Sequence, residues 1–145
     1  MAARGCLYGV DVLSVREIVH DAPVTPLPKA PPLIEGVVEL DGRMLPVFDL
    51  GRSLDGPSAA GGGEARIVVL KTDGMVLGMR VEAAVDVLSV DAADLQAPEG
   101  VLDGGRGPVR AVVRRAEAEP VLVLELSRLI EAVGAGSRKR AEYAA

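Results

Sequence analysis

The chain has 145 residues and a net charge of −5, and its only aromatic residues are one phenylalanine and two tyrosines. Nucleic-acid binding normally needs a basic face or aromatic stacking platforms, so this composition argues against it. One cysteine excludes an internal disulfide, no stretch has the pattern of a signal peptide, and no apolar run approaches the roughly 20 residues that span a bilayer. We therefore expect a cytoplasmic protein without direct membrane insertion, whose partner is another protein or a small molecule.

Residues 34–50 have the pattern of a β-hairpin. The segment IEGVVEL shows the period of two that is expected of a half-buried strand. Asp41 and Gly42 then supply two residues that tolerate positive φ, as a type I′ turn requires, before the return strand RMLPVFDL. Pro46 in the return strand has no N–H to donate, which favours an edge position or a bulge. Gly42 and Pro46 are therefore expected to serve the turn and the strand geometry.

A Gly-rich connector at residues 55–64 separates this hairpin from a second one. The stretch SLDGPSAAGGGEA is small and polar, so it carries too little apolar surface to fold by itself. The second hairpin is predicted from ARIVVLK and MVLGMRV, which flank a turn around Thr72-Asp73-Gly74. The connector is the expected internal boundary of the chain.

One short amphipathic helix is predicted near the C-terminus. Leu126, Leu129, Ile130 and Val133 recur at the spacing i, i+3, i+4 and i+7. Ser127 is a candidate N-cap, and the glycine after Val133 is a stop signal. The tail at 134–145 has little apolar surface to bury and is expected to fray.

A weak internal repeat is the most informative feature of the chain. GVDVLSVREIV from Gly9 resembles GMRVEAAVDVL from Gly78, and LPVFDLGRSL from Leu45 resembles EPVLVLELSRLI from Glu119. Two β modules docked face to face fit this repeat better than one open sheet, because a short sheet alone leaves an apolar face and an edge unprotected. The predicted fold is all-β, with two small barrels around a shared core and a groove between them. The expected subdomains are about 7–54 with part of the C-terminal segment, and about 65–126.

No catalytic or metal-binding set emerges from the sequence. His20 is the only histidine and Cys6 the only cysteine, so a metal cluster or a Cys-His pair lacks partners. Carboxylate pairs such as Asp91 and Asp94 have no His or Lys beside them, and the glycine-rich stretches lack the Lys-Ser/Thr of a phosphate loop. We expect no enzymatic activity, no cofactor and no metal.

Apolar residues of the two modules are the remaining candidates for a binding surface. They are Val15 and Ile18 in the first copy, and Val85 and Val87 in the second. Each is compatible with an ordinary place in the core. Two modules that each offer a Val-rich strand can also line a shared groove that accepts an amphipathic partner helix. The sequence leaves both interpretations open.

Several short motifs follow one another in a characteristic order. YGVDVLSVREI precedes VTPLPKAPPLIEGVVELDGRMLPVFDL, and VVLKTDGMVLGMRVEAAVDVLSV follows the connector. The order of Tyr8-Gly9, Thr25-Pro26, Gly36-Val37 and Asp49-Leu50 is more specific than any single dipeptide. Over about residues 7–133 the chain resembles the CheW-like domains, the adaptor fold of bacterial chemosensory systems. The whole chain is accordingly interpreted as a single CheW-like domain over 1–145.

This resemblance implies two five-stranded SH3-like barrels and a non-catalytic adaptor role. Members of the family bridge the CheA-type histidine kinase and the cytoplasmic domains of methyl-accepting chemoreceptors. Receptor contact in the family lies in the groove between the barrels, at positions that match Val15 and Gly36, with Glu17 and Asp41 at the rim. The kinase contact lies on other barrel surfaces, and other CheW-like proteins are further implied partners.

The chain departs from the family pattern at the N-terminus and in the first hairpin. Only residues 1–7 precede Tyr8, where the family has a full strand and turn, so the first barrel is expected to lack a strand or to have an open edge. Where the family has Asn-Leu-Arg-Gly, this chain has Glu-Leu-Asp-Gly at 39–42, which would place Asp41 near the like charge of Glu17. These departures favour an adaptor that keeps receptor binding while its kinase contact is weakened or lost.

Two alternatives stay open at this stage. The first is an ordinary CheW protein that couples both receptor and kinase. The second is a small ligand-binding β-barrel protein, which would need an enclosed pocket with convergent polar groups.

Overall fold

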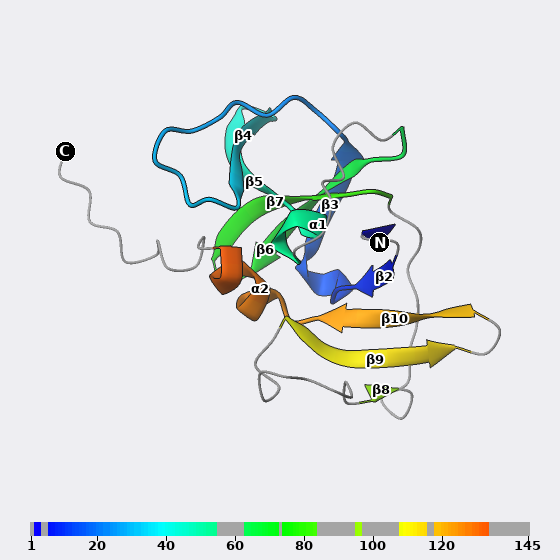
Figure 1. Cartoon of the computed structure of the whole chain (residues 1–145). Coiled ribbons are helices and arrows are strands. Elements are labelled where there is room, and N and C mark those ends of the chain that lie inside the picture. The colour runs from blue at the N-terminus through cyan, green and yellow to red at the C-terminus, as the bar shows by residue number, and fades with distance from the viewer. Residues whose placement is uncertain are drawn as a thin grey trace.

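The computed structural model describes residues 2–3, 6–54, 63–72, 74–83, 95–96, 108–115 and 118–133. These residues form two five-stranded sheets with few helices (Figure 1). The predicted all-β fold is confirmed. The predicted tail at 134–145 and most of the connector at 55–64 lie outside the described residues.

The first sheet, here called the central sheet, has the order β3-β6-β7-β5-β4. Its strands are β3 (Val15–His20), β4 (Ile34–Leu40), β5 (Arg43–Asp49), β6 (Arg66–Thr72) and β7 (Met75–Val81). The second, here called the terminal sheet, has the order β1-β2-β10-β9-β8. Its strands are β1 (Ala2–Ala3), β2 (Cys6–Gly9), β8 (Leu95–Gln96), β9 (Val109–Arg115) and β10 (Ala118–Leu124). The helices are a 3₁₀ turn (Val12–Ser14), α1 (Leu50–Ser53) and α2 (Leu126–Val133).

The two sheets contain the same structural unit, and each unit combines the glycine strand of one sequence copy with the Pro-Val strand of the other. In the central sheet, β5 pairs in parallel with β7, placing Val47 opposite Gly78, and leads into α1. In the terminal sheet, β10 pairs in parallel with β2, placing Val123 opposite Gly9, and leads into α2. Each module therefore joins a Gly-containing strand to a Pro-Val strand that precedes a helix.

The sheets divide the chain differently from the expected subdomains. β6 and β7 follow the connector, yet they pair with β3 and β5, so the central sheet extends from residue 15 to residue 81. The terminal sheet combines the N-terminal strands with strands β8 to β10. The expectation that one barrel lacks a strand does not hold, because both sheets have five strands. Within the described residues, the two edge strands of the terminal sheet are two residues long.

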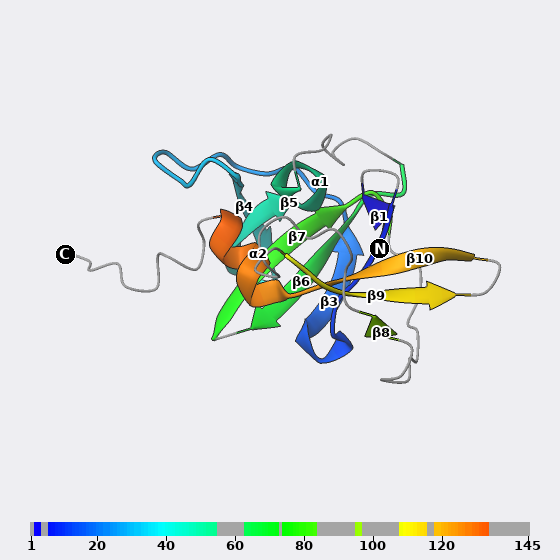
Figure 2. The ribbon, with the colours of Figure 1, turned by 60° about the horizontal axis from the view of Figure 1, so that its bottom comes forward.

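The main hydrophobic core contains residues of both sheets. Phe48 and Leu70 come from the central sheet, and Tyr8 and Leu124 come from the terminal sheet. Helix α2 adds the buried side chains of Leu126, Leu129, Ile130 and Val133. Figure 2 shows α2 next to β6 and β7 of the central sheet, at one end of the β9-β10 hairpin. The prediction of a shared core is confirmed.

Helix α2 lies where its periodicity predicted it, but its first turn differs in detail. The helix begins at Leu126, so Ser127 lies inside the first turn and is not the N-cap. Its hydroxyl is 3.1 Å from a carboxylate oxygen of Glu125, to which it donates a hydrogen bond. None of the helices in the described part of the chain has the length and apolar character needed to cross a bilayer.

Residues 21–33, here called the strap, connect the two edge strands β3 and β4 (Figure 1). The strap lies against β4, because the N–H of Thr25 donates to the carbonyl of Val37 at 2.9 Å and the N–H of Val37 donates to the carbonyl of Thr25 at 2.8 Å. A second, smaller core lies beneath it. That core consists of Val38, Val47 and Ile67, with Val19, Ala22 and Val24 packed against them. The strap therefore closes the central sheet into a barrel.

Candidate partner-binding surface

Glu17 and Asp41, which were predicted to lie near each other, are found at one end of the central sheet. They line a hollow of about 220 Å³, here called the mouth. Strand β3 contributes Glu17, and the turn between β4 and β5 contributes Asp41. All five strands of the sheet supply residues to the lining, which consists of Arg16, Glu17, Leu40, Asp41, Arg43, Leu45, Val69 and Val76.

The β4-β5 turn sets the position of Asp41. The φ angles of Asp41 and Gly42 are 50° and 77°, and Leu40 pairs with Arg43 across the turn. Positive φ at both central residues is the geometry that a type I′ turn requires, so the predicted turn is confirmed. Aspartate tolerates this left-handed conformation better than most residues, because its short side chain can bond locally. The turn thus leaves the Asp41 side chain exposed at the tip of the hairpin.

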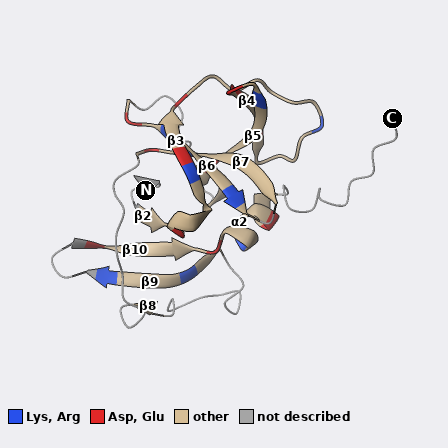
Figure 3. Ribbon diagram, turned by 180° about the vertical axis from the view of Figure 1, so that it is seen from behind, with Lys and Arg blue, Asp and Glu red and all other residues tan. Residues whose placement is uncertain are grey.

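The mouth has an apolar floor and a charged rim. Its rim carries two acidic side chains, Glu17 and Asp41, and two basic ones, Arg16 and Arg43, all of them exposed. Figure 3 shows basic and acidic positions side by side on β3. No ion pair joins these four side chains to one another or to any other described residue. The rim is therefore balanced in charge, and its groups are available to a partner.

Sequence reasoning missed the two arginines of the rim. Arg16 adjoins Glu17, and Arg43 directly follows the Asp41-Gly42 turn. The sequence could have indicated them, because each arginine lies within two residues of one of the two acidic residues. Both guanidinium groups offset the repulsion that was expected between Glu17 and Asp41.

Val15 and Ile18 lie on the opposite face of β3 from the mouth. Ile18 is paired with Val68 and Val15 with Leu70, and both partners belong to the main core. Side chains paired across antiparallel strands point to the same face, so Val15 and Ile18 point towards the main-core side. Val15 is half-buried against this core, whereas Ile18 is 50% exposed. Of these two residues, Ile18 is the one with apolar surface to offer a partner.

The remaining predicted residues do not add directly to this surface. Gly36 is buried, and a Cβ atom there would lie 2.0 Å from the carbonyl oxygen of Thr25 in the strap. A glycine is therefore needed so that the strap can lie against β4, and Gly36 shapes the surface through the strap. Val85 and Val87 lie outside the described residues, as do Asp91 and Asp94.

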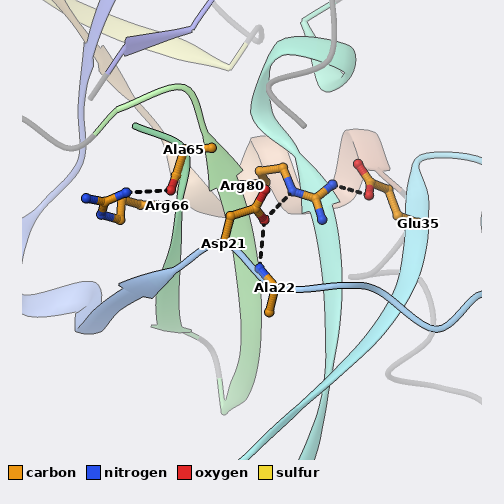
Figure 4. Close-up of polar contacts among 6 residues, drawn as sticks. All are labelled: Asp21, Ala22, Glu35, Ala65, Arg66 and Arg80. Atoms are coloured by element: carbon orange, nitrogen blue, oxygen red, sulfur yellow. Dashed lines mark hydrogen bonds and ion pairs between the residues drawn. The ribbon is translucent and has the colours of Figure 1, made fainter. Parts of the chain in front are cut away.

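A buried ion cluster, which sequence reasoning also missed, holds the other end of the central sheet. Arg80 on β7 is only 4% exposed. Its Nε donates to the carboxylate of Asp21 at 2.9 Å, and its guanidinium also pairs with Glu35 (Figure 4). These three residues are here called the clamp. The signal for it was a single charged residue inside the otherwise apolar strand MVLGMRV.

The clamp keeps Arg80 charged in spite of its burial. Burial would lower the pKa of the guanidinium, but hydrogen bonds and charge from Glu35 and Asp21 outweigh it and raise that pKa above its ordinary value. A buried charge is tolerated when it is paired and hydrogen-bonded in this way. Arg80 is therefore a permanent cation that ties together two acidic residues from different parts of the chain.

In the part of the chain that the structure describes, no group of three or more His, Cys, Asp or Glu side chains is placed to hold a metal ion. A second hollow, of about 170 Å³, is lined by residues of both sheets, including Thr72 and Arg110. Ligand pockets usually measure at least about 300 Å³, so the two hollows are small for that role.

These features define a class of protein: two related β modules around one core, with an exposed surface suited to protein contacts. Comparison with known proteins agrees with this description. Residues 2–134 match the family model described as CheW-like domain. The chemotaxis protein CheW of Treponema pallidum is 30% identical over 132 residues, covering 85% of this chain and 75% of the relative. CheW of Rhizobium meliloti is 33% identical over 120 residues, covering 82% and 77%.

A solved structure shows the same likeness. The scaffolding protein TtCheW from Thermoanaerobacter tengcongensis superposes with a TM-score of 0.79 at 26% identity, covering 90% of this chain and 88% of that one. The present chain belongs to the CheW-like domain family. The resemblance noted in the sequence is thus confirmed, and with it the two-module SH3-like fold.

Proposed function

We propose that this protein is a non-catalytic adaptor of a chemosensory pathway, and that it binds the cytoplasmic domain of a chemoreceptor. The proposal rests on the side chains that the two faces of β3 present. One face of this edge strand presents the half-exposed Ile18, and the other presents Glu17 to the mouth, where Asp41 lies. Because β3 is an edge strand, a partner that lies along its edge can contact both the apolar Ile18 on one face and the charged rim on the other.

The chemistry of this surface suits an amphipathic helix. An apolar side chain of the helix would pack against Ile18, and its charged neighbours would face the two acidic and two basic groups of the mouth. Rim charges mainly affect association rate and partner choice, whereas buried anchors supply most of the affinity. Ile18 is therefore expected to govern how tightly the receptor binds, and Asp41 to govern which partner binds.

We propose in addition that the CheA-type kinase binds more weakly than the receptor. The support is strand β1 at the edge of the terminal sheet, which is two residues long in the described part of the chain. A kinase contact at that edge would find little backbone with which to pair. The competing proposal is an ordinary CheW protein that couples receptor and kinase with similar affinity.

Titration calorimetry against a purified receptor signalling domain and, separately, against the kinase tests both proposals. Ile18→Glu should weaken receptor binding by about tenfold or more, as expected when an interface anchor is lost. Leu95→Glu is the matched control, because Leu95 is also exposed (37%) but lies on the edge of the terminal sheet. It should leave receptor affinity unchanged.

The outcomes separate the possible functions. Binding of the receptor but not of the kinase supports the proposal in full. Equal tight binding to both partners would show an ordinary coupling protein. Binding to neither, or an Ile18→Glu variant that binds like the wild type, would overturn the adaptor proposal or the assigned surface respectively.

A further inference from the structure

In the part of the chain that the structure describes, the strap and the clamp hold the two edge strands of the central sheet together at one of their ends. β3 and β4 are not neighbours in the sheet order, and they run in opposite directions. The end of β3 therefore lies towards the start of β4, where the strap crosses and Thr25 bonds to Val37. At the opposite end, β3 begins and β4 finishes, and there the mouth opens with Glu17 and Asp41 on its two sides.

The clamp bridges the closed end through side chains. Asp21 follows the last residue of β3, and Glu35 is the second residue of β4. Arg80 contacts both from β7, the middle strand of the sheet. Asp21 is fixed further, because its carboxylate also accepts the N–H of Ala22 at 3.0 Å (Figure 4). One buried cation thus sets where both edge strands lie relative to the centre of the sheet.

We propose that Arg80 is a positioning residue, which fixes the separation of β3 and β4 and thereby the distance between Glu17 and Asp41 across the mouth. Its effect on binding rests on the proposed receptor contact. The physical reason is that a buried ion cluster often adds little stability compared with well-packed apolar residues, whereas its directional bonds select one geometry. Removal of the cluster should therefore change the shape of the mouth more than the stability of the fold.

Two variants distinguish an effect of the clamp on the shape of the mouth from its effect on the stability of the fold. Arg80→Met leaves Asp21 and Glu35 without their cation, so its urea midpoint should fall clearly. The triple variant Asp21→Asn, Glu35→Gln, Arg80→Met removes all the charges, so its urea midpoint should return most of the way to the wild-type value. If the geometry of the mouth or the receptor affinity is still changed in the triple variant, the cause is the loss of positioning and not a weakened fold.

The first readout needs no partner. Spin labels are attached to Arg16→Cys on β3 and Glu39→Cys on β4, both exposed positions, in a protein that also carries Cys6→Ser. Double electron-electron resonance then measures the distance between the labels. We expect a narrow distribution with the clamp intact and a broadened or shifted one in the triple variant. An unchanged distribution in a stable triple variant would overturn the proposed role of Arg80.

The second readout is affinity for the receptor signalling domain. The triple variant should bind about fivefold or more weakly, within the usual range of coupling between distant sites. If the wild-type protein does not bind the receptor, the proposed function fails, while the spin-label experiment still decides the positioning role. If the distribution broadens but affinity stays at the wild-type value, the clamp positions the edge strands, and the proposed effect of that positioning on receptor binding is refuted.

Discussion

The central sheet and the terminal sheet share one repeated unit but differ in how their edges are closed. Both pair a Gly-containing strand in parallel with a Pro-Val strand that leads into a helix. In the central sheet the edge strands are six and seven residues long and are joined by the strap and the clamp. In the terminal sheet the described edge strands are two residues long. The shared unit contributes to the core, whereas the mouth is lined by residues from the five strands of the central sheet and its β4-β5 turn.

The largest expected effect concerns the strap, which lies against β4 of the central sheet. Gly36→Ala should lower the free energy of unfolding by at least about 3 kcal/mol, because the new Cβ would collide with the backbone of Thr25 at 2.0 Å. Urea denaturation measures this change. Gly42→Asn is the control, because Gly42 has open space around it and Asn tolerates positive φ. A loss below about 1 kcal/mol for Gly36→Ala would contradict the close packing of strap and strand.

The next effect compares the repeated glycines directly. A Cβ at Gly78 would lie 2.9 Å from a methyl group of Ile67 and 3.2 Å from one of Val47, whereas at Gly9 it would lie 3.1 Å from a methyl group of Val121. Gly78→Ala should therefore lower the free energy of unfolding by about 1–3 kcal/mol, and Gly9→Ala by less. Parallel urea titrations of the two variants provide the test. Equal losses would show that the two modules are packed equally tightly.

A smaller effect is expected at the helix that follows each Pro-Val strand. Asp49 is the N-cap of α1, and its buried carboxylate accepts the N–H of Arg52 at 3.1 Å. Asp49→Ala should lower the free energy of unfolding by about 1–2 kcal/mol. Glu125, which precedes α2, provides the comparison, since Glu125→Ala removes a less buried group. Thermal unfolding of both proteins measures the difference, and a larger loss at Glu125 would reverse the predicted order.

The smallest effect on stability is expected at the rim of the mouth, where a substitution should nevertheless change binding. Asp41→Arg should change the free energy of unfolding by less than about 1 kcal/mol, because the side chain is exposed. It would leave Glu17 as the only acidic group among four rim charges, so affinity for receptor or kinase should change. Glu131→Arg on the exposed side of α2 makes the same change in net charge and serves as control. Unaltered affinity for both partners would exclude Asp41 from partner choice.

Local patterns were sufficient to predict many elements of this protein. The Asp41-Gly42 turn, the two hairpins, helix α2 and the repeat each depend on residues close together in sequence, where spacing and turn chemistry determine the outcome. The resemblance to CheW-like domains also placed Glu17 and Asp41 near one another, and the structure brings both into the mouth.

Only the tertiary structure decided the contacts between distant segments. β5 pairs with β7 across the connector, and Arg80 reaches Asp21 and Glu35 over separations of 59 and 45 residues. Gly36 was predicted as a contact residue, and only the structure shows that the strap lies against it. Local periodicity tells which face of a strand is apolar, yet it carries no information about which distant strand or charge will meet that face. Those pairings are selected by the packing of the whole chain around its shared core.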